Sequence, residues 1–330
     1  MTAAARRARG LGGPDSVLFL RLGKLGDMMV TACLFRAMRR AHPKARLGLV
    51  TLPRSAQFSR ALPDLDEVHV WRPLTLPLLA LRLRGRWDWM VDLNELPSRR
   101  SRLARRLIAP RRTAVFRGAG LPADIVMDAP PKEASHVIER MAAAGRALGL
   151  PTAGFKPVVP LDAARLAGAR REAGRGLAVA LNLSAGSPSR YWPVERWQAL
   201  ATALLKADRR VSLQILHDPK DAALAAQLSA ALPAARLRPS PGPGLWDFLA
   251  AIAANRLLVT PDTSAVHAAC ALGVRVVGLY PEPAWNLASW GPWGPGHQAL
   301  RSPQGGLQGL PLEPVRAAAL RALKNRRPLP

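Results

Sequence analysis

The chain has 330 residues, of which 49% are hydrophobic, and it carries 48 Lys and Arg against 22 Asp and Glu, a formal net charge of +26. This length and apolar content exclude a disordered chain and allow two domains, each with its own core. The excess of positive charge indicates an anionic partner, which could be nucleic acid, an anionic membrane surface or an acidic glycolipid.

The cysteines, the histidines and the apolar runs give no sign of a disulfide-rich, metal-binding or membrane-spanning protein. Cys33 and Cys270 are the only cysteines and stand far apart, so neither a disulfide framework nor a cysteine metal site is indicated. The six histidines lack metal-ligand spacing, and we expect neither a metal nor a cofactor. No run reaches the ~18 apolar residues of a membrane span, and the apolar run 17–20 is too short for a signal peptide. We therefore expect a cytoplasmic protein.

The first half of the chain alternates between strand-like and helix-like sequence. After a basic tail, residues 1–16, apolar runs predict strands at 17–22, 45–51, 68–71 and 87–93. The first strand leads through a glycine turn, residues 23–27, into a helix that runs to about residue 41. This alternation is typical of a parallel sheet in an α/β domain, which we place at residues 17–150.

Asp27 stands at or near the start of the first predicted helix. A carboxylate is favoured there by the helix dipole, so a capping role is the simplest interpretation of this residue taken alone. The surrounding sequence RLGKLGD matches neither the GxGxxG fingerprint nor a phosphate-binding P-loop, so neither nucleotide motif is assigned.

A run of arginines follows the fourth predicted strand. Its members are Arg99, Arg100, Arg102, Arg105, Arg106, Arg111 and Arg112. Their spacing does not confine them to one helical face, so some of them are solvated surface charge. The others would lie at the mouth of the first domain, where guanidinium groups could bind the carboxylates or phosphates of an acidic acceptor. The sequence does not decide which of them do so.

The second half of the chain repeats the α/β pattern after a Pro-rich segment, residues 151–160, which we interpret as a linker. A helix is predicted at about 162–173, strands at 177–183 and 211–216, and a helix at 246–255. Pro193 stands where a first-turn proline is expected at the start of another helix. We place the second domain at residues 161–310 and a closing amphipathic helix with its tail at residues 311–330.

The stretch 255–294 reads as strand, helix and strand with a parallel crossover. Asp262, Thr263 and Ser264 follow the apolar run 257–259 and supply helix-capping side chains before the small-residue run 265–272. A helix amino terminus at the end of a strand favours an anion such as a diphosphate. His267, four residues after Thr263, would lie on the same helix face. The competing interpretation is a plain cap and a surface histidine.

Four segments, in this order along the chain, together resemble the glycosyltransferase family 9 heptosyltransferases. They are RLGKLGD (21–27), WDWMVDLN (87–94), NLSAGSPSRYWPVERW (182–197) and the stretch from Asp262 through His267 to the Trp-Gly-Pro near its end. Pro261 and Ser264 replace the usual Asn and Gly of the family, and Arg190 replaces its usual Lys. The resemblance covers about residues 17–300.

The resemblance implies a GT-B fold, α/β, with two doubly wound Rossmann-like parallel-sheet domains facing a cleft. It implies metal-independent transfer of a heptosyl group from ADP-heptose to a lipopolysaccharide inner-core acceptor, with inversion at the anomeric carbon. The first domain would bind the acceptor and the second the nucleotide sugar. The positive charge would hold the enzyme peripherally at the inner face of the inner membrane.

The resemblance also assigns residues to roles. Asp27 occupies the position of the general base. The implied donor-binding residues are Arg190, Asp262, Thr263, Ser264, His267, Ser187 and Asp218, with Asp221 as an alternative to Asp218 for the ribose. For the acceptor we expect the basic residues Arg21, Lys24, Arg99, Arg100 and Arg102 to bind its anionic groups.

Two other classes of function stay open. A catalytically silent paralogue that binds a sugar nucleotide or glycolipid would keep the fold, although the retained Asp27 argues against it. A nucleic-acid-binding protein would account for the net charge of +26, but no recognised module is present and aromatic residues make up only 5%. We therefore expect no nucleic acid partner.

Overall fold

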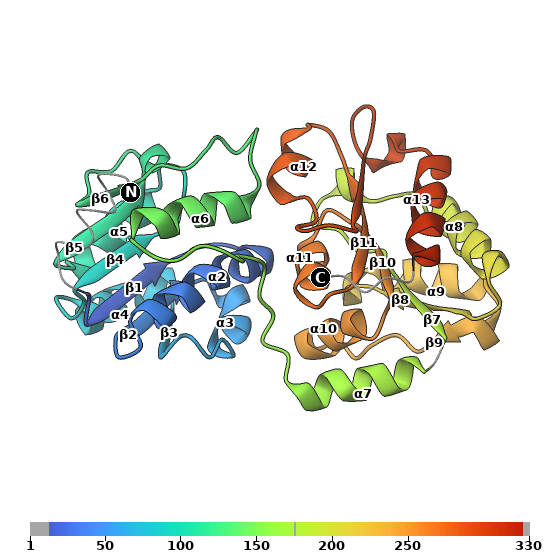
Figure 1. Cartoon of the computed structure of the whole chain (residues 1–330), viewed down its shortest axis with the longest axis horizontal. Coiled ribbons are helices and arrows are strands. Elements are labelled where there is room, and N and C mark those ends of the chain that lie inside the picture. The colour runs from blue at the N-terminus through green and yellow to red at the C-terminus, as the bar shows by residue number, and fades with distance from the viewer. Residues whose placement is uncertain (1–12, 175, 326–330) are drawn as a thin grey trace. The chain divides into compact units, whose positions relative to one another are not determined.

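The computed structural model describes residues 13–174 and 176–325, and the chain divides into two compact units (Figure 1). Unit 1 comprises Met1–Pro131 and Val137–Pro160, and unit 2 comprises Lys132–His136 and Leu161–Pro330. Most of the expected tail 1–16 and the end of the segment 311–330 lie outside the described residues.

Unit 1 is a six-stranded parallel sheet with helices on its two faces. Its strands are β1 (Ser16–Leu20), β2 (Arg46–Thr51), β3 (Glu67–Val70), β4 (Trp89–Asp92), β5 (Arg112–Phe116) and β6 (Ile125–Met127), and its helices are α2 (Leu25–Ala41), α3 (Pro53–Arg60), α4 (Leu76–Leu83), α5 (Arg99–Ile108) and α6 (Val137–Ala147). The strand order is β3-β2-β1-β4-β5-β6.

Strand β1 shows why this sheet is covered on both faces. Its five residues are all buried, and successive side chains point to opposite faces of a strand. Phe19 packs against Phe35 of α2, with ring centroids 4.7 Å apart. Leu18 and Leu20 belong instead to a core cluster with residues of α4 and α5. A strand whose side chains are buried on both faces is stable only where helices cover both faces of the sheet.

Unit 2 repeats this architecture with a second six-stranded parallel sheet. Its strands are β7 (Leu177–Asn182), β8 (Val211–Leu216), β9 (Leu237–Arg238), β10 (Leu257–Pro261), β11 (Arg275–Tyr280) and β12 (Gln298–Arg301), and its helices are α7 (Ala163–Ala173), α8 (Val194–Ala207), α9 (Ala222–Ala230), α10 (Leu245–Ala253), α11 (Ser264–Ala271), α12 (Trp285–Trp290) and α13 (Leu312–Lys324). The strand order is β12-β11-β10-β7-β8-β9.

Both sheets reverse their strand order at an equivalent place. In unit 1 the chain builds outward from β1 to β3 and then restarts on the other side with β4, and in unit 2 the same reversal separates β7 from β10. The crevice at the carboxyl ends of the two strands that flank such a switch point is the usual ligand site of an open parallel sheet. Unit 1 therefore has its expected ligand edge at the carboxyl ends of β1 and β4, and unit 2 has its own at the carboxyl ends of β7 and β10.

The Trp-Pro segment before α8 is part of the core of unit 2. Trp192 and Trp197 are buried and pack edge to face, with ring centroids 5.0 Å apart. The indole Nε1 of Trp192 donates to the carbonyl of Leu310 at 2.9 Å. These contacts fix the chain immediately after Arg190.

The strands expected from the apolar runs are confirmed, with ends that shift by one or two residues. Among the elements that the sequence had not indicated are α5, β5, β6, β9 and β12. The expected linker, residues 151–160, is grouped with unit 1, where Phe155 and Val158 are buried and the N–H of Val158 donates to the carbonyl of Met29 at 2.9 Å. The short segment Lys132–His136 is grouped with unit 2.

Candidate functional site

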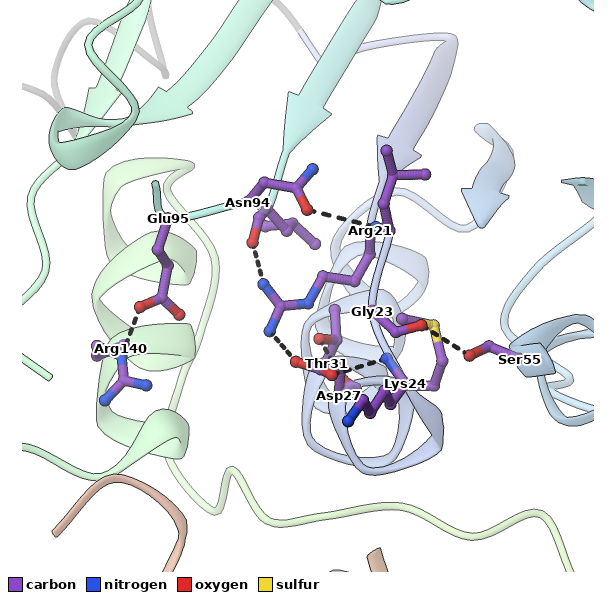
Figure 2. A network of polar contacts seen from close by, with 12 residues as sticks. Arg21, Gly23, Lys24, Asp27, Thr31, Ser55, Asn94, Glu95 and Arg140 are labelled. Atoms are coloured by element: carbon purple, nitrogen blue, oxygen red, sulfur yellow. Dashed lines mark hydrogen bonds and ion pairs between the residues drawn. The ribbon is translucent and has the colours of Figure 1, made fainter. Parts of the chain in front are cut away.

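Asp27 lies directly beyond the carboxyl end of β1, in the first turn of α2 (Figure 2). Its Oδ2 accepts a hydrogen bond from the backbone N–H of Lys24 at 2.8 Å, and its Oδ1 forms an ion pair with Nη2 of Arg21 at 2.6 Å. The side chain of Asp27 keeps 22% of its surface exposed. The carboxylate is therefore both a helix cap and an accessible, firmly oriented group.

Arg21 holds this carboxylate in place from inside the protein. Its guanidinium is buried and donates from Nη1 to the carbonyl of Leu93 beyond β4, besides pairing with Asp27. A Cβ atom at residue 23 would lie 2.5 Å from the side chain of Asp27, so only glycine fits at this position. Arg21 was expected to bind the acceptor, but the structure places it behind Asp27 as an internal partner.

Asn94 connects β1, β4 and α5 at the same edge of the sheet. Its backbone N–H and its Nδ2 donate to Oδ1 of Asp92 at 2.9 and 2.7 Å, and its Oδ1 accepts from the N–H of Leu22 at 3.4 Å. Nδ2 also lies 3.3 Å from Oγ of Ser101 in the first turn of α5. Burial raises the pKa of Asp92, while hydrogen bonds and the charge of Arg21 act in the opposite direction.

This connection brings the start of α5 to the edge that carries Asp27. Arg99, Arg100 and Arg102 are exposed in its first turns, and Lys24 is exposed beside Asp27. A second ion pair, between Nε of buried Arg140 on α6 and Glu95, spans 2.9 Å next to this edge (Figure 2). The sequence reasoning had not singled out Arg140 or Glu95, because they are far apart in the chain.

In unit 2, Arg190 and Asp262 form an ion pair at the carboxyl edge of the second sheet. Nη2 of Arg190 lies 3.1 Å from Oδ2 of Asp262, and Nη1 donates to the backbone carbonyl of Asp262 at 3.0 Å. Asp262 is buried, whereas the side chain of Arg190 is 30% exposed. The fork of Arg190 is thus fixed by Asp262 and still reaches the surface.

Thr263 caps α11 beside this ion pair. Its Oγ1 accepts from the N–H of Ala265 at 3.3 Å, which satisfies one of the free donors at the helix start. Nδ2 of Asn182, at the end of β7, donates to Oγ1 of Thr260 at 2.9 Å and lies 3.4 Å from Oγ1 of Thr263. Ser264 is the first residue of the helix. The ends of β7 and β10 are therefore joined around one helix amino terminus that lies next to the guanidinium of Arg190.

His267 is less accessible than its position after Thr263 suggested. Its side chain is only 3% exposed, and its ring lies 6.4 Å from that of His136 and 5.8 Å from that of Trp290. His136 stacks on Trp293 with ring centroids 4.7 Å apart, and its Nε2 is 2.9 Å from the carbonyl of Gly291. His267 therefore belongs to an aromatic cluster behind the helix start, together with a histidine that the sequence reasoning had not considered.

The loops after β7 and β8 complete this edge of unit 2. Oγ of Ser187 lies 3.3 Å from Oγ of Ser189 in the loop that leads to Arg190. The N–H of Asp218 donates to Oγ of Ser184 at 2.7 Å, and Asp218 is exposed. Asp221 instead accepts from the hydroxyl of Tyr191 at 3.1 Å. Of the two acids expected near the ribose, Asp218 is exposed, whereas the carboxylate of Asp221 is hydrogen-bonded to Tyr191.

Lys220 is a further cation at this edge. Its Nζ donates to the carbonyl of Ala185 at 2.9 Å and lies 5.7 Å above the ring of Tyr191. A hydrogen bond with Tyr191 raises the pKa of Lys220. Its place after a strand in the run His-Asp-Pro-Lys-Asp was the only signal in the sequence that could have indicated it.

The described residues offer no evident metal site and no membrane span. No group of three or more His, Cys, Asp or Glu side chains among them is arranged to hold a metal ion. None of the described helices has the length and apolarity needed to cross a bilayer. Burial raises the pKa of both cysteine thiols, Cys33 and Cys270, to about 12, so that they are protonated and unreactive at neutral pH.

Comparison with known proteins gives a consistent result. Residues 82–308 match the model of the family described as glycosyltransferase family 9 (heptosyltransferase). A comparison with curated proteins finds none that matches.

Several solved structures share the fold. A glycosyl transferase family 9 protein from Veillonella parvula DSM 2008 is 18% identical, with a TM-score of 0.76 over 93% of this chain and 97% of that chain. The ADP-heptose lps heptosyltransferase II of E. coli is 21% identical, with a TM-score of 0.74 over 93% and 98% of the two chains. The E. coli heptosyltransferase WaaC, solved with ADP, is 17% identical, with a TM-score of 0.75 over 93% and 99%. The expected α/β fold with two doubly wound parallel sheets, of the GT-B class, is confirmed.

Proposed function

The chain belongs to glycosyltransferase family 9 and is a glycosyltransferase, and from this premise we propose that it transfers a heptosyl residue from ADP-heptose to the inner core of lipopolysaccharide. The family description and the two E. coli structures named as heptosyltransferases support this choice of sugar. The acidic nature of such an acceptor also suits a chain with a net charge of +26.

The pairing of Arg190 with Asp262 beside the start of α11 is the observation that carries the proposal. A transferred sugar leaves a nucleoside diphosphate, whose growing negative charge must be stabilised. A helix amino terminus and a fixed guanidinium supply positive charge at one place without needing to reorganise. Arg190, Thr263 and Ser264 would bind the diphosphate, and Ser187 would add a hydroxyl from the neighbouring loop.

Asp262 and His267 act in this proposal through their neighbours. Both are buried, so we assign them to positioning: Asp262 orients Arg190, and His267 supports the helix start from the aromatic cluster. Asp218, whose carboxylate is exposed after β8, would bind the ribose hydroxyls of the donor.

Asp27 would be the general base of the reaction. Inverting displacement requires a group that removes the proton of the acceptor hydroxyl as that oxygen attacks the anomeric carbon. The carboxylate of Asp27 is partly exposed at the switch point of unit 1, and Arg21 and the Lys24 N–H hold its two oxygens. Arg21 serves here to orient the base.

Lys24, Arg99, Arg100 and Arg102 would bind the anionic groups of the acceptor. All four are exposed at the edge that carries Asp27. Because the acceptor is anchored in a membrane, the enzyme would act from the cytoplasm as a peripheral protein on the inner face of the inner membrane, where positive charge favours binding to anionic lipids.

Calorimetric titration of ADP and of ADP-heptose into the protein tests the donor site. Arg190→Ala removes the guanidinium while leaving the helix start, and we expect it to weaken ADP binding by roughly 10- to 100-fold. Arg210→Ala is a matched control, because Arg210 is an exposed arginine of the same unit that precedes β8, at the opposite edge of the sheet. If Arg190→Ala and Arg210→Ala bound ADP as tightly as the parent, the proposed diphosphate site would be wrong.

A further inference from the structure

The exposed large hydrophobic side chains among the described residues gather in one part of unit 1. Leu74 precedes α4 and is 95% exposed, and Leu78 and Leu81 on α4 are 71% and 74% exposed. Leu103 of α5 and Leu96, shortly before α5, complete the set. Single exposed leucines are ordinary, but a cluster on adjacent elements indicates a binding surface.

The packing of α4 and α5 does not require these leucines. The two helices are in contact, and they bury Leu83, Ala104 and Ile108 in the core beneath the sheet. The N–H of Gly85 donates to the carbonyl of Ile108 at 2.8 Å, which ties their carboxyl ends together. Leu78 and Leu81 are three residues apart and lie on the solvent face of α4. The inner faces thus stabilise the fold, and none of the residues in 13–174 and 176–325 covers the apolar outer face.

The segments that carry Leu74, Leu78, Leu81 and Leu103 are basic and contain no acidic residue, although Glu95, which is paired with Arg140, directly precedes Leu96. Residues 72–87 contain four arginines and residues 96–112 contain seven, and neither range contains a single Asp or Glu. On α5, Leu103 lies among Arg99, Arg102 and Arg106 on the exposed face, while Ser101, Ala104 and Ile108 face inward. Such a surface suits an anionic membrane, because the leucines can enter the apolar layer while the arginines contact the negatively charged headgroups.

We infer that the outer surface of α4 and α5, with Leu74, docks on an anionic lipid bilayer. Leu74, Leu78, Leu81 and Leu103 enter the boundary between headgroups and acyl chains, and the exposed Arg82 and Arg106, which lie outside the proposed acceptor site, bind lipid phosphates. The aliphatic character of the exposed side chains argues against nucleic acid, which single-strand-binding proteins hold on aromatic platforms. This docking rests on the proposed function, which supplies an acceptor anchored in a membrane. Beyond attraction between charges, it adds the insertion of apolar side chains into the bilayer.

Vesicle sedimentation with the full chain tests the inference. Vesicles of phosphatidylcholine mixed with phosphatidylglycerol are compared with vesicles of phosphatidylcholine alone. The variant Leu78→Gln/Leu81→Gln makes the exposed face of α4 polar with a residue that favours helix, and Leu78→Met/Leu81→Met is its matched control, because it keeps that face apolar. We expect the Gln variant to lower the partition coefficient onto the anionic vesicles by at least about tenfold and the Met variant by less than about threefold.

Two further readouts separate this inference from the proposed function. Activity towards a water-soluble acceptor fragment should be the same in the Gln variant and the parent, since neither leucine belongs to the proposed sites. Loss of vesicle binding with retained activity on the fragment supports the inference. Unchanged vesicle binding in the Gln variant overturns it, and so does a leucine-dependent dimer in light scattering without vesicle binding. A parent that binds vesicles through these leucines but transfers no sugar contradicts only the proposed function.

Discussion

Asp27 combines a structural and a proposed chemical task in one carboxylate. One oxygen caps α2 through the N–H of Lys24, and the other is paired with buried Arg21. Asn in place of Asp keeps an oxygen that can accept from Lys24 but loses the charge that compensates Arg21. A change at this position therefore acts on stability and on chemistry, and each effect needs its own measurement.

Asp27→Asn should lower kcat by roughly 10²–10⁴-fold, the usual contribution of general-base catalysis, while donor affinity stays the same. Loss of the ion pair to a mostly buried arginine should also lower the free energy of unfolding by about 1–3 kcal/mol, seen in a denaturant titration. Arg21→Gln is the control, because it breaks the same ion pair and keeps the carboxylate. Equal losses of kcat in both variants would assign the effect to the ion pair and not to a base.

Residues next to a strand in a recognisable motif could be found from the sequence, whereas partners from distant segments could not. Arg190 and Thr263 follow β7 and β10 closely, and the motifs pointed to both. Nothing in the sequence near His267 indicated that His136 would lie beside it, because that contact depends on the tertiary fold. Arg21 was expected to bind the acceptor at the surface, but it is buried. The sequence shows a charged residue after a strand and does not show the partners that bury it.

At the scale of elements, α5 shows how an arginine-rich run becomes a regular helix. Arginines occupy half of its ten positions, yet Ser101, Ala104 and Ile108 recur at a helical spacing and face the core. Ser98 caps its start by accepting from the N–H of Ser101 at 3.3 Å. The spread of the arginines does not by itself indicate this helix, whereas the spacing of the small and apolar inward residues does. The short strands β6 and β9 were missed because two or three residues carry no detectable alternation.

Arg99→Glu/Arg102→Glu should raise KM for the acceptor by about tenfold or more, because it places negative charge where an anionic acceptor is proposed to bind. The affinity for ADP should not change. Arg170→Glu/Arg171→Glu on α7 is a matched control with the same change of charge at exposed positions of unit 2. An acceptor KM that rises equally in both double variants would indicate only a general effect of net charge.

His297, between α12 and β12, should make stability depend on pH. Burial lowers its pKa to about 4, with Arg275 adding to the effect, and its Nδ1 accepts from the N–H of Val276 at 3.2 Å. The unfolded chain, with a histidine pKa near 6.5, binds this proton more readily, so stability should be lost as pH falls from about 6.5 to 4, by up to about 1.4 kcal/mol per pH unit. His297→Asn removes the titrating group, and its unfolding free energy should fall less steeply over this range. A slope equal to that of the parent would exclude His297 as the source.

At the scale of the whole molecule, the chain is two α/β units with separate cores. The core of unit 1 includes Trp87 with Leu18 and Leu20, and that of unit 2 includes Trp192 and Trp197. Alternating strands and helices predicted both units, because parallel neighbouring strands are joined by crossover connections, which are usually helices. The chain passes from unit 1 to unit 2 between Pro160 and Leu161, and the Pro-rich segment 151–160 packs on unit 1. The grouping of the short segment Lys132–His136 with unit 2 was not predicted.

Scanning calorimetry can separate the two units if ADP binds only unit 2. At 100 times its dissociation constant, ADP should stabilise the unit that binds it by about 2.7 kcal/mol. We expect one of two unfolding transitions to move to higher temperature and the other to stay in place. In Arg190→Ala, whose ADP binding should be 10- to 100-fold weaker, the same ADP concentration should stabilise this unit by only about 0.4–1.4 kcal/mol. A shift of full size in Arg190→Ala would place the nucleotide elsewhere.

The most direct test of the central claim is mass spectrometry of the product after the protein is incubated with ADP-heptose and a lipopolysaccharide inner core that lacks heptose. The proposal predicts an acceptor heavier by one heptosyl residue, release of ADP, and a rate that falls strongly in Asp27→Asn. UDP-glucose is the matched donor control and should give no product. Transfer from UDP-glucose without transfer from ADP-heptose, in a protein that folds and binds nucleotide, would contradict the claim.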